Sequence, residues 1–353
     1  MIKIGATEIE LDKPPYFVAD IAANHDGDIN RAFKLIELAK EAGANAAKFQ
    51  NFRAETIISE NAFKSAAQVG HQAKWKKSVF ETYQDASLPF DWTQRLKEKC
   101  EEVNIEYFTS PYDFEAVDFV DKYVNCYKIG SGDITWIDFI EYIAKKNKPV
   151  MLATGASSFE DVKRAVEKII AINPELILMQ CNTNYTANLE NFEYINLNVL
   201  TKYKENWNGL ILGLSDHTKG HSTVLGAITL GARVIEKHFT DNENREGPDH
   251  KFSMTPIEWE KMVRAANELF LSLGDGIKRV EKNENDTVKI QRRSIYLVSD
   301  KKQGDVLSPE DFIMLRPYNT DGFAPFELND IIGKKCLVNL SCKSLLKRSD
   351  IYV

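Results

Sequence analysis

The sequence contains few cysteines, and they form none of the patterns that usually give cysteine a role. Its five cysteines are scattered, without a CxxC pair or a spacing that fits a metal site or a disulfide framework. An odd number of such thiols is typical of a reducing compartment. No apolar run reaches the ~20 residues that a membrane helix requires, and the first residues do not resemble a signal peptide. We therefore expect a cytoplasmic protein that does not act at a membrane.

An excess of positive charge is also missing. Lys and Arg together number 45 against 52 Asp and Glu, which gives a formal net charge of -7. A field of that sign repels phosphate backbones, so we expect no nucleic-acid partner. A small anion can still bind where the local charge is positive. The hydrophobic fraction of 43% and the charged fraction of 27% are those of a globular protein with a large core.

A regular alternation of short apolar runs and amphipathic stretches extends from Pro15 to about Leu273. The apolar runs predict strands at Phe17–Ile21, Ala46–Gln50, Glu106–Thr109, Cys126–Gly130, Val150–Thr154, Ile177–Cys181, Ile211–Leu214 and Arg233–Phe239. The stretches between them predict helices at Ile29–Ala42, Trp92–Val103, Glu115–Lys122, Trp136–Lys146, Phe159–Ile172, Phe192–Tyr203 and Ser222–Leu230. Strands that alternate with helices in this number predict a closed (β/α)8 TIM barrel. An open doubly wound sheet is the alternative. However, Asn24-His25-Asp26-Gly27 follows the first strand, where that fold would carry a glycine-rich dinucleotide turn.

The pattern changes after Gly274. The charged segment Lys278–Lys289 has no apolar periodicity and predicts a linker or an exposed helix. After Gln291, strand-like pieces at Ser294–Val298 and Lys335–Asn339 predict a small, mostly β unit. The resulting division is a barrel domain (1–275), a linker (276–291) and a second domain (292–353).

Polar residues gather where the predicted strands end. The carboxyl ends of all strands in a barrel surround one opening, so residues that are distant in sequence meet there. These polar residues are Asn24 and His25, Lys48 and Gln50, Ser110, Lys128 with Ser131 and Asp133, Thr154, residues 182–185, Ser215 to His217, and Glu236 to His238.

Two of these residues, His217 and His238, end the seventh and eighth predicted strands, which are neighbours in a closed barrel. Imidazoles on adjacent strands can bind one divalent cation, with carboxylates or water completing the coordination. Asp216 and Asp249 are nearby candidates. A histidine at a strand end more often makes structural hydrogen bonds, so both interpretations remain open from the residues alone.

Three lysines lie within or at the end of apolar strands, namely Lys48, Lys128 and Lys237. A buried, unpaired ammonium group is costly, so each lysine needs a partner. An anion such as a phosphate or carboxylate in the opening is one candidate, and hydroxyl donors to it could come from Ser110, Ser131 and Ser215. A salt bridge with Glu236 or Asp133 is the second candidate and fits Lys237 best. A Schiff base on Lys48 or Lys128 is the third.

Six motifs occur in a fixed order: Asn24-His25-Asp26-Gly27, Lys48-Phe49-Gln50, Lys128-Ile129-Gly130-Ser131-Gly132, Leu214-Ser215-Asp216-His217, Glu236-Lys237-His238-Phe239 and Gly247-Pro248-Asp249-His250-Lys251. Together they resemble the sialic acid synthase family, whose members make nonulosonic acids. The C-terminal segments Arg292-Arg293-Ser294, Met314-Leu315-Arg316-Pro317 and Ile332-Gly333-Lys334-Lys335 resemble the antifreeze-like (SAF, β-clip) domain of the same enzymes. The resemblance extends over essentially the whole chain.

The resemblance implies a transferase that condenses phosphoenolpyruvate with an N-acylated mannosamine-type or diacetamido sugar aldehyde and releases phosphate by C–O cleavage. It also implies Mn²⁺ or Mg²⁺ as cofactor and a domain-swapped homodimer. It places the metal on His217 and His238, and phosphoenolpyruvate on Lys48, Ser110, Lys128, Ser131 and Ser215. It places the sugar on Asn24, Gln50, Thr183, Tyr185, Asp249 and, from the partner subunit, Arg316. The catalytic residues that it implies are Asp20, Asp133, His217 and His238.

The chain departs from the family pattern at several positions near the implied sugar site. Asp20 and Asp133 stand where the family usually has Glu, and Ala153 stands where Ser is common. The segments Tyr185-Thr186-Ala187-Asn188 and Tyr318-Asn319-Thr320 also differ from the usual sequence. These departures leave the identity of the sugar open. Three alternative functions are a phosphoenolpyruvate-dependent 3-deoxy-ulosonate synthase that uses a phosphorylated sugar, a Schiff-base lyase, and a non-catalytic sugar or phosphate binder.

Overall fold

The apolar runs of the sequence form a closed parallel sheet in the computed structural model, which describes residues 1–65, 72 and 75–352. The barrel strands are β3 (Tyr16–Asp20), β4 (Ala46–Asn51), β5 (Glu106–Pro111), β6 (Tyr127–Ile129), β7 (Val150–Ala153), β8 (Leu176–Cys181), β9 (Ile211–Asp216) and β10 (Ala232–His238). Neighbours along the chain pair with each other, and β10 closes the barrel against β3. The predicted TIM barrel is confirmed, and the open doubly wound alternative is wrong.

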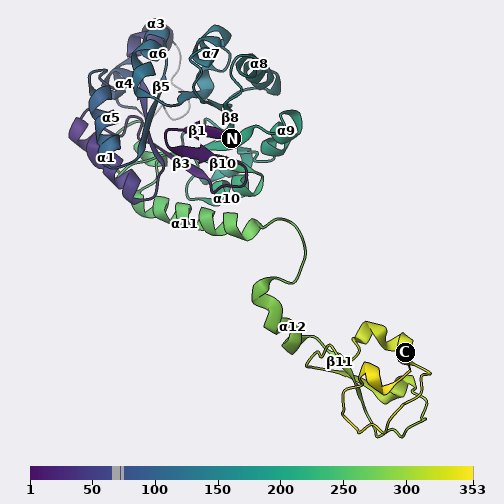
Figure 1. Cartoon of the computed structure of the whole chain (residues 1–353). Coiled ribbons are helices and arrows are strands. Elements are labelled where there is room, and N and C mark those ends of the chain that lie inside the picture. Colours follow the sequence, from purple (N-terminus) through teal and green to yellow (C-terminus); the bar gives the residue numbers. More distant parts are fainter. Residues whose placement is uncertain (66–71, 73–74, 353) are drawn as a thin grey trace. The chain divides into compact units, whose positions relative to one another are not determined.

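Helices surround this barrel, as Figure 1 shows. They are α1 (Ile29–Glu41), α5 (Trp92–Glu102), α6 (Phe114–Val120), α7 (Ile137–Ala144), α8 (Phe159–Ile170), α9 (Val199–Asn206), α10 (Ser222–Thr229) and α11 (Pro256–Leu273). Between β4 and α5 the described residues include three short helices, namely α2 (Ala54–Ile57), α3 (Glu60–Ser65) and α4 (Val79–Ala86). Within the described residues, no helix combines the length and the apolar character that are required to cross a bilayer.

Helix α8 illustrates how the local sequence determines these elements. Ser158 and Asp161 form a reciprocal capping box that satisfies backbone donors at its first turn. The apolar side chains recur at the helical spacing, so one face is buried, and this face consists of Val162, Ala165, Val166 and Ile169. The remaining residues of the helix face solvent or are partly covered.

The ninth helix begins later than the sequence pattern predicts. The predicted helix Phe192–Tyr203 is replaced by a 3-10 segment, Leu189–Tyr194, followed by α9 from Val199. Between them Asn196 has a φ of 49°, in the left-handed region. A right-handed helix cannot continue through that conformation, and Asn tolerates it better than most residues.

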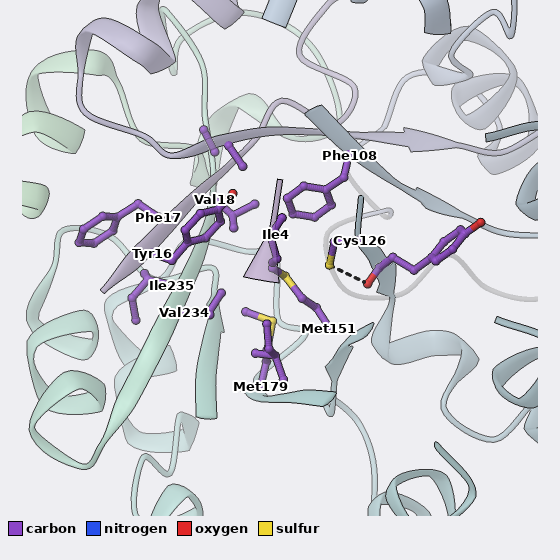
Figure 2. Packing of buried hydrophobic residues seen from close by; sticks show 14 of the residues in the cluster. Ile4, Tyr16, Phe17, Val18, Phe108, Cys126, Met151, Met179, Val234 and Ile235 are labelled. Atoms are coloured by element: carbon purple, nitrogen blue, oxygen red, sulfur yellow. Dashed lines mark hydrogen bonds between the residues drawn. The ribbon is translucent and has the colours of Figure 1, made fainter. Parts of the chain in front are cut away.

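An N-terminal hairpin, absent from the sequence predictions, covers the amino-terminal end of the barrel. It consists of β1 (Ile2–Ile4) and β2 (Thr7–Ile9), which pair antiparallel around Gly5 at a φ of 57°. A Cβ at Gly5 would meet the side chains of Glu106, the first residue of β5, and of Asn125, which precedes β6. Figure 2 shows Ile4 of the hairpin in the same hydrophobic cluster as Phe108 and Met151 of the barrel. The opposite, carboxyl-terminal end is therefore the one that can be open to ligands.

The chain divides into two compact units, Met1–Gly274 and Asp275–Val353. The second unit contains α12 (Asn285–Gln291), the antiparallel pair β11 (Ser294–Leu297) and β12 (Phe312–Leu315), and α13 (Leu328–Ile331). Its own core consists of Ile295, Leu297, Leu307, Phe323, Ile331, Cys336, Leu346 and Ile351. The predicted strand Lys335–Asn339 is wrong, because this segment makes only the isolated bridges of Lys335 and Cys336.

Trp259 of α11 provides a test of how the barrel is held together. Its side chain is fully buried and meets Phe239 edge-on at 5.5 Å. We expect Trp259→Ala to destabilise the barrel unit by about 3–5 kcal/mol, because it leaves a cavity in the core. Urea unfolding followed by circular dichroism measures this loss. Ile257→Ala, at a position that is 67% exposed on the same helix, is the control and should cost no more than about 0.5 kcal/mol. Equal midpoints for the two variants would contradict the packing described.

Candidate active site

The register of the strands brings charged residues to one level at the carboxyl end of the barrel. Asp20 pairs with His238 on one side and with Lys48 on the other. Ser215 pairs with Glu236. Because side chains alternate between the two faces of a strand, Glu236 and His238 both point into the barrel, as does Lys48 on its own strand. Residues from four strands therefore meet at this level.

Two lysines and two carboxylates form an ionic cluster inside the barrel. Lys48 Nζ lies 2.6 Å from Asp20 Oδ2 and 3.5 Å from Glu236 Oε1. Lys128 Nζ lies 2.9 Å from the same Glu236 oxygen. Each of these four side chains is at most 5% exposed. The sequence left a salt bridge and a bound anion as alternative partners for these lysines, and the structure shows the salt bridges.

Burial and pairing act in opposite directions on the charges of this cluster. Burial raises the pKa of Glu236, but the charges of Lys128 and Lys48 outweigh it and lower the pKa to about 2. Burial lowers the pKa of Lys48, yet Asp20 and Glu236 hold it above its ordinary value. For Asp20, burial prevails over the attraction of Lys48, and its pKa is raised. Glu236 therefore stays ionised at neutral pH, whereas Asp20 takes up a proton more readily than an ordinary aspartate.

Lys237 belongs to a separate pair on the outer face of its strand. Its Nζ lies 2.5 Å from Asp216 Oδ2 and donates to the carbonyl of Thr218 at 2.6 Å. The sequence favoured Glu236 or Asp133 as its partner, and this expectation is wrong. Adjacent residues of a strand point to opposite faces, so Lys237 cannot follow Glu236 into the barrel. For the same reason Asp216 is turned away from the histidine pair that it was expected to support.

The serines of the expected phosphoenolpyruvate site differ in their surroundings. Ser215 donates to Glu236 Oε1 at 3.1 Å, and Ser131 accepts from the Gly155 amide at 2.8 Å. Ser110 is 1% exposed, and its hydroxyl has no hydrogen-bond partner among the described residues. An unpaired buried hydroxyl is costly, so Ser110 is the member of this set that most needs a ligand.

The two histidines lie together and are uncharged at neutral pH. Their ring centroids are 5.4 Å apart. Burial, and then the neighbouring His238, lower the pKa of His217 to about 3, and burial lowers that of His238 to about 4. His217 Nδ1 lies 2.9 Å from the carbonyl oxygen of Asn182, which can only accept, so Nδ1 carries the proton and Nε2 has a free lone pair. His238 Nδ1 is buried without a hydrogen-bond partner in the described chain.

This donor set suits a metal only if other ligands complete it. Neutral imidazoles with free nitrogen lone pairs are good ligands for a divalent transition metal. Across residues 1–65, 72 and 75–352, however, no group of three or more His, Cys, Asp or Glu side chains could hold a metal ion. The two histidines therefore fit a cation whose coordination is completed by water or by the substrate.

A cavity of about 160 Å³ lies beside His238. Its lining residues are Ala23, Gln50, Phe52, Ile57, Trp75, Thr82, Tyr83, Ala86, Tyr112, Tyr185, His238, Pro248 and Asp249. Gln50 also donates to Asp20 at 3.1 Å, which links the cavity to the ionic cluster. Tyr185 meets the His217 ring edge-on at 4.5 Å. Three expected sugar contacts, Gln50, Tyr185 and Asp249, therefore line one space.

The other expected sugar and catalytic residues are placed differently. Asn24 donates to the carbonyl of Phe239 and to Ser253, both at 2.9 Å, and is not part of the cavity lining. Thr183 packs against Gly155. Asp133 lies in a 3-10 turn, where burial raises its pKa to about 6. Arg316 lies in the second unit and donates to the carbonyl of Gln291 at 2.7 Å. The roles of these residues stay predictions.

The loop that carries Asp249 is fastened to the loop after β3. Asp26 accepts from Arg245 at 2.7 Å and is bonded to His250 at 2.8 Å. Arg31 joins the same carboxylate at 3.1 Å. Asp249 itself accepts from the Ala23 amide at 3.2 Å and lies 3.9 Å from His238. This network holds the Asp249 carboxylate beside the imidazole of His238.

The sequence predictions named Glu236 only as a candidate salt-bridge partner, chiefly of Lys237, and they missed the aromatic wall of the cavity. Glu236 lies two residues before His238, and the alternation of side chains along a strand could have placed it inside the barrel. The wall residues Phe52, Trp75 and Tyr83 belong to the segment between β4 and α5, which has no periodic signal that relates it to the strand ends.

The fold and this buried, charged site define a (β/α)8-barrel enzyme. The model of the NeuB family matches residues 35–278, and the chain belongs to this family. The chain is 33% identical over 95% of its length to the N,N'-diacetyllegionaminic acid synthase of Campylobacter jejuni, of which it covers 99%. It is 32% identical over 96% of its length to a pseudaminic acid synthase of the same species, of which it covers 97%.

A solved structure is similar as well. The N-acetylneuraminic acid synthetase of Leptospira borgpetersenii, solved in complex with citrate, superposes with a TM-score of 0.72 at 28% identity. The match covers 81% of this chain and 94% of that one. The resemblance to sialic acid synthases that the motifs carry is thereby confirmed at the level of the family.

The pair formed by Lys237 and Asp216 gives a prediction that separates structural from ligand-binding lysines. We expect Lys237→Met to destabilise the barrel by about 3–5 kcal/mol, because it leaves the Asp216 carboxylate buried without its cation. Denaturant titration measures the change. The control is Lys145→Met at the C-cap of α7, where the side chain is 60% exposed and the change should alter stability by less than about 1 kcal/mol. If both variants unfold at the wild-type midpoint, the buried pair does not hold these strands.

Proposed function

We propose that this protein is a nonulosonic acid synthase that condenses phosphoenolpyruvate with an N-acylated amino-sugar aldehyde and releases phosphate. The observation that carries the proposal is the meeting of Lys48, Lys128 and two neutral histidines at one end of the barrel, next to a cavity. Cations, free imidazole nitrogens and a space for a second reactant are what this condensation requires. Membership of the NeuB family supports the same reaction.

In this proposal, Lys48 and Lys128 bind the phosphoenolpyruvate anion. Both ammonium groups are already buried and oriented by Asp20 and Glu236, so little reorganisation is needed when an anion arrives. Ser110 contributes a hydroxyl that has no partner among the described residues, Ser131 follows β6, and Ser215 lies on β9. This arrangement fixes C3 of phosphoenolpyruvate toward the cavity. Holding two reactants in this way can contribute roughly 7–11 kcal/mol to catalysis.

The proposed reaction forms one C–C bond and breaks one C–O bond. C3 of phosphoenolpyruvate adds to the aldehyde carbon of the sugar, and water then adds to C2. The resulting tetrahedral hemiketal phosphate loses phosphate by cleavage of its C2–O bond. Asp20 and Asp133, whose pKa values are both raised by burial, are the proposed proton carriers. Gln50, Tyr185 and Asp249 orient the sugar from the cavity wall.

His217 and His238 are the proposed ligands of a divalent cation, Mn²⁺ or Mg²⁺. His217 would bind through Nε2, because its Nδ1 is bonded to the carbonyl of Asn182. When bound, such a cation polarises the carbonyl oxygen of the sugar as a Lewis acid. The Asn182 carbonyl fixes the orientation of the His217 ring before a metal binds. Residues that hydrogen-bond to a metal ligand commonly have this role.

Replacement of either histidine tests this assignment. We expect His217→Ala and His238→Ala to lower turnover by on the order of 10²–10³-fold, because both remove stabilisation of the developing alkoxide. Phosphate release from phosphoenolpyruvate and an amino sugar measures it, with and without chelator and added Mn²⁺. The control, His221→Ala, changes a histidine at the start of α10 and should keep activity. Full wild-type activity in chelator would refute the metal role.

Arg316 of the second unit is the proposed contact to the sugar's acyl group, supplied by the partner subunit of a homodimer in which antifreeze-like domains are exchanged. We expect Arg316→Ala to raise the KM for the sugar by about 10-fold, because it removes a charged hydrogen bond. Mixing Arg316→Ala with His217→Ala subunits should restore activity, because one barrel of each mixed dimer then has both residues. If no activity returns in mixtures that are shown to exchange subunits, the trans arrangement is wrong.

A further inference from the structure

The loop that follows β10 carries Asp249 between Arg245 and His250, which both bind the carboxylate of Asp26. Arg245 Nη2 lies 2.7 Å from Asp26 Oδ2, and His250 Nε2 lies 2.8 Å from Asp26 Oδ1. His250 is fully buried, and its Nδ1 lies 2.8 Å from Thr240 Oγ1. Because Asp249 directly precedes His250, the place of its carboxylate depends on where His250 is held.

Arg31 of α1 connects the loops after β3 and β10 a second time. Its Nε donates to the carbonyl of Asn24 at 2.8 Å and lies 3.1 Å from Asp26 Oδ2. Its two terminal nitrogens donate to the two oxygens of Asp241 at 2.8 and 2.6 Å. A bidentate pair of this kind has a well-defined geometry. We call this set of side chains the loop clasp: Asp26, Arg31, Asp241, Arg245 and His250.

The barrel itself is closed by a different set of contacts. β10 and β3 are paired from Val234 and Tyr16 to His238 and Asp20, and the clasp residues lie beyond the ends of both strands. Asp26 has a φ of 52°, in the left-handed region, which is unfavourable for residues other than glycine although Asp tolerates it better than most. Such conformations persist where the surrounding structure requires them, and they are common near functional sites. The clasp therefore holds the loops rather than the strands.

The two loops that the clasp joins form one side of the cavity. Asp249 lines the cavity from one loop, and Ala23 lines it from the other. The Asp249 carboxylate accepts from the Ala23 amide at 3.2 Å and lies 3.9 Å from His238 Nδ1. The loop is tightly packed, because a Cβ on Gly247 would lie 2.7 Å from His250 Cδ2. A displacement of the clasp would therefore move Asp249 relative to His238.

We infer that Asp26 is a positioning residue for the sugar half of the reaction: it acts on Asp249 through the clasp and does not contact a substrate itself. The inference rests on the proposed function, which makes Asp249 a sugar contact. A shift of about 1 Å in a group that orients a reactant can lower the rate by about 10²-fold. The phosphoenolpyruvate site should be unaffected, because Lys48 and Lys128 are held by a separate ionic cluster.

Two variants of Asp26 test the inference, with phosphate release from phosphoenolpyruvate in the presence of Mn²⁺ and an amino sugar as the readout. The sugar is N-acetylmannosamine or 2,4-diacetamido-2,4,6-trideoxymannose, whichever the wild-type protein converts faster. We expect Asp26→Ala to lower kcat/KM for the sugar by about 10–100-fold and to leave the Kd for phosphoenolpyruvate in calorimetry unchanged. Asp26→Asn should stay within about 3-fold of wild type, because an amide still accepts from Arg245 and can donate to the other tautomer of His250.

The control is Asp118→Ala on α6, which removes a carboxylate that is 56% exposed and paired with Lys146. It should change neither constant. Wild-type kcat/KM in Asp26→Ala would overturn the inference. A parallel rise in the Kd for phosphoenolpyruvate would also overturn it, because the damage would then extend to the whole barrel end.

A double-mutant cycle with Asp249→Asn separates positioning from a purely structural role. If Asp26 acts through Asp249, adding Asp26→Ala to Asp249→Asn should lower kcat/KM by less than about 2-fold further, because the group that it places is already impaired. Losses that multiply would show that the two residues act independently, which contradicts the inference.

Hydrogen exchange followed by mass spectrometry tests the clasp without any need for turnover. Asp26→Ala should raise exchange several-fold in peptides from residues 240–253 and leave β7 and β8 at their wild-type rates, because the opening is local. Unchanged exchange in residues 240–253 would show that the clasp does not hold this loop. If the loop loosens as expected but the wild-type protein releases no phosphate with either sugar, the proposed function fails, and the inference about the sugar half of the reaction fails with it.

Discussion

Two ammonium groups and two carboxylates share the interior of one barrel end, and each depends on the others for its charge. Lys48 and Lys128 are stable there because Asp20 and Glu236 lie within ion-pair distance. Removing one member would leave an unmatched buried charge, which costs more than the pair contributes to stability. Such a cluster is therefore better explained by ligand binding than by folding. Under the proposed function, it keeps positive charge desolvated and in place for the anion of phosphoenolpyruvate. The buried Ser110 hydroxyl, which has no partner within the described part of the chain, is consistent with the same use.

The barrel could be predicted from the sequence because its strands are short and continuously apolar and its helices are amphipathic. These patterns place each strand to within two residues of its observed ends. The misses have local causes. The 3-10 segment before α9 depends on a left-handed Asn196, which periodicity does not register. The hairpin β1–β2 is only three residues per strand, too short for an alternation to be recognised.

The sequence predicted which residues form the candidate site better than it predicted the contacts among them. Because the carboxyl ends of all barrel strands surround one opening, we expected Lys48, Lys128, His217 and His238 to lie close together. The structure places all four at that end of the barrel. The partners of the lysines could not be chosen from neighbours in sequence, because pairing in a barrel runs across strands. The aromatic wall comes from a segment without strand or long-helix periodicity, so only the folded chain shows that it faces His238 across one cavity.

The central claim is that Lys128, although paired with Glu236, is a binding group for phosphoenolpyruvate. Isothermal titration calorimetry of phosphoenolpyruvate with the wild-type protein and with Lys128→Met tests it most directly, with Lys145→Met as the control for loss of one surface charge. Loss of a hydrogen bond between charged groups weakens binding by about 1.5–3 kcal/mol, so we expect Kd to rise by roughly 10–100-fold in Lys128→Met alone. A folded Lys128→Met protein that binds phosphoenolpyruvate with the wild-type Kd would show that the buried cluster is structural.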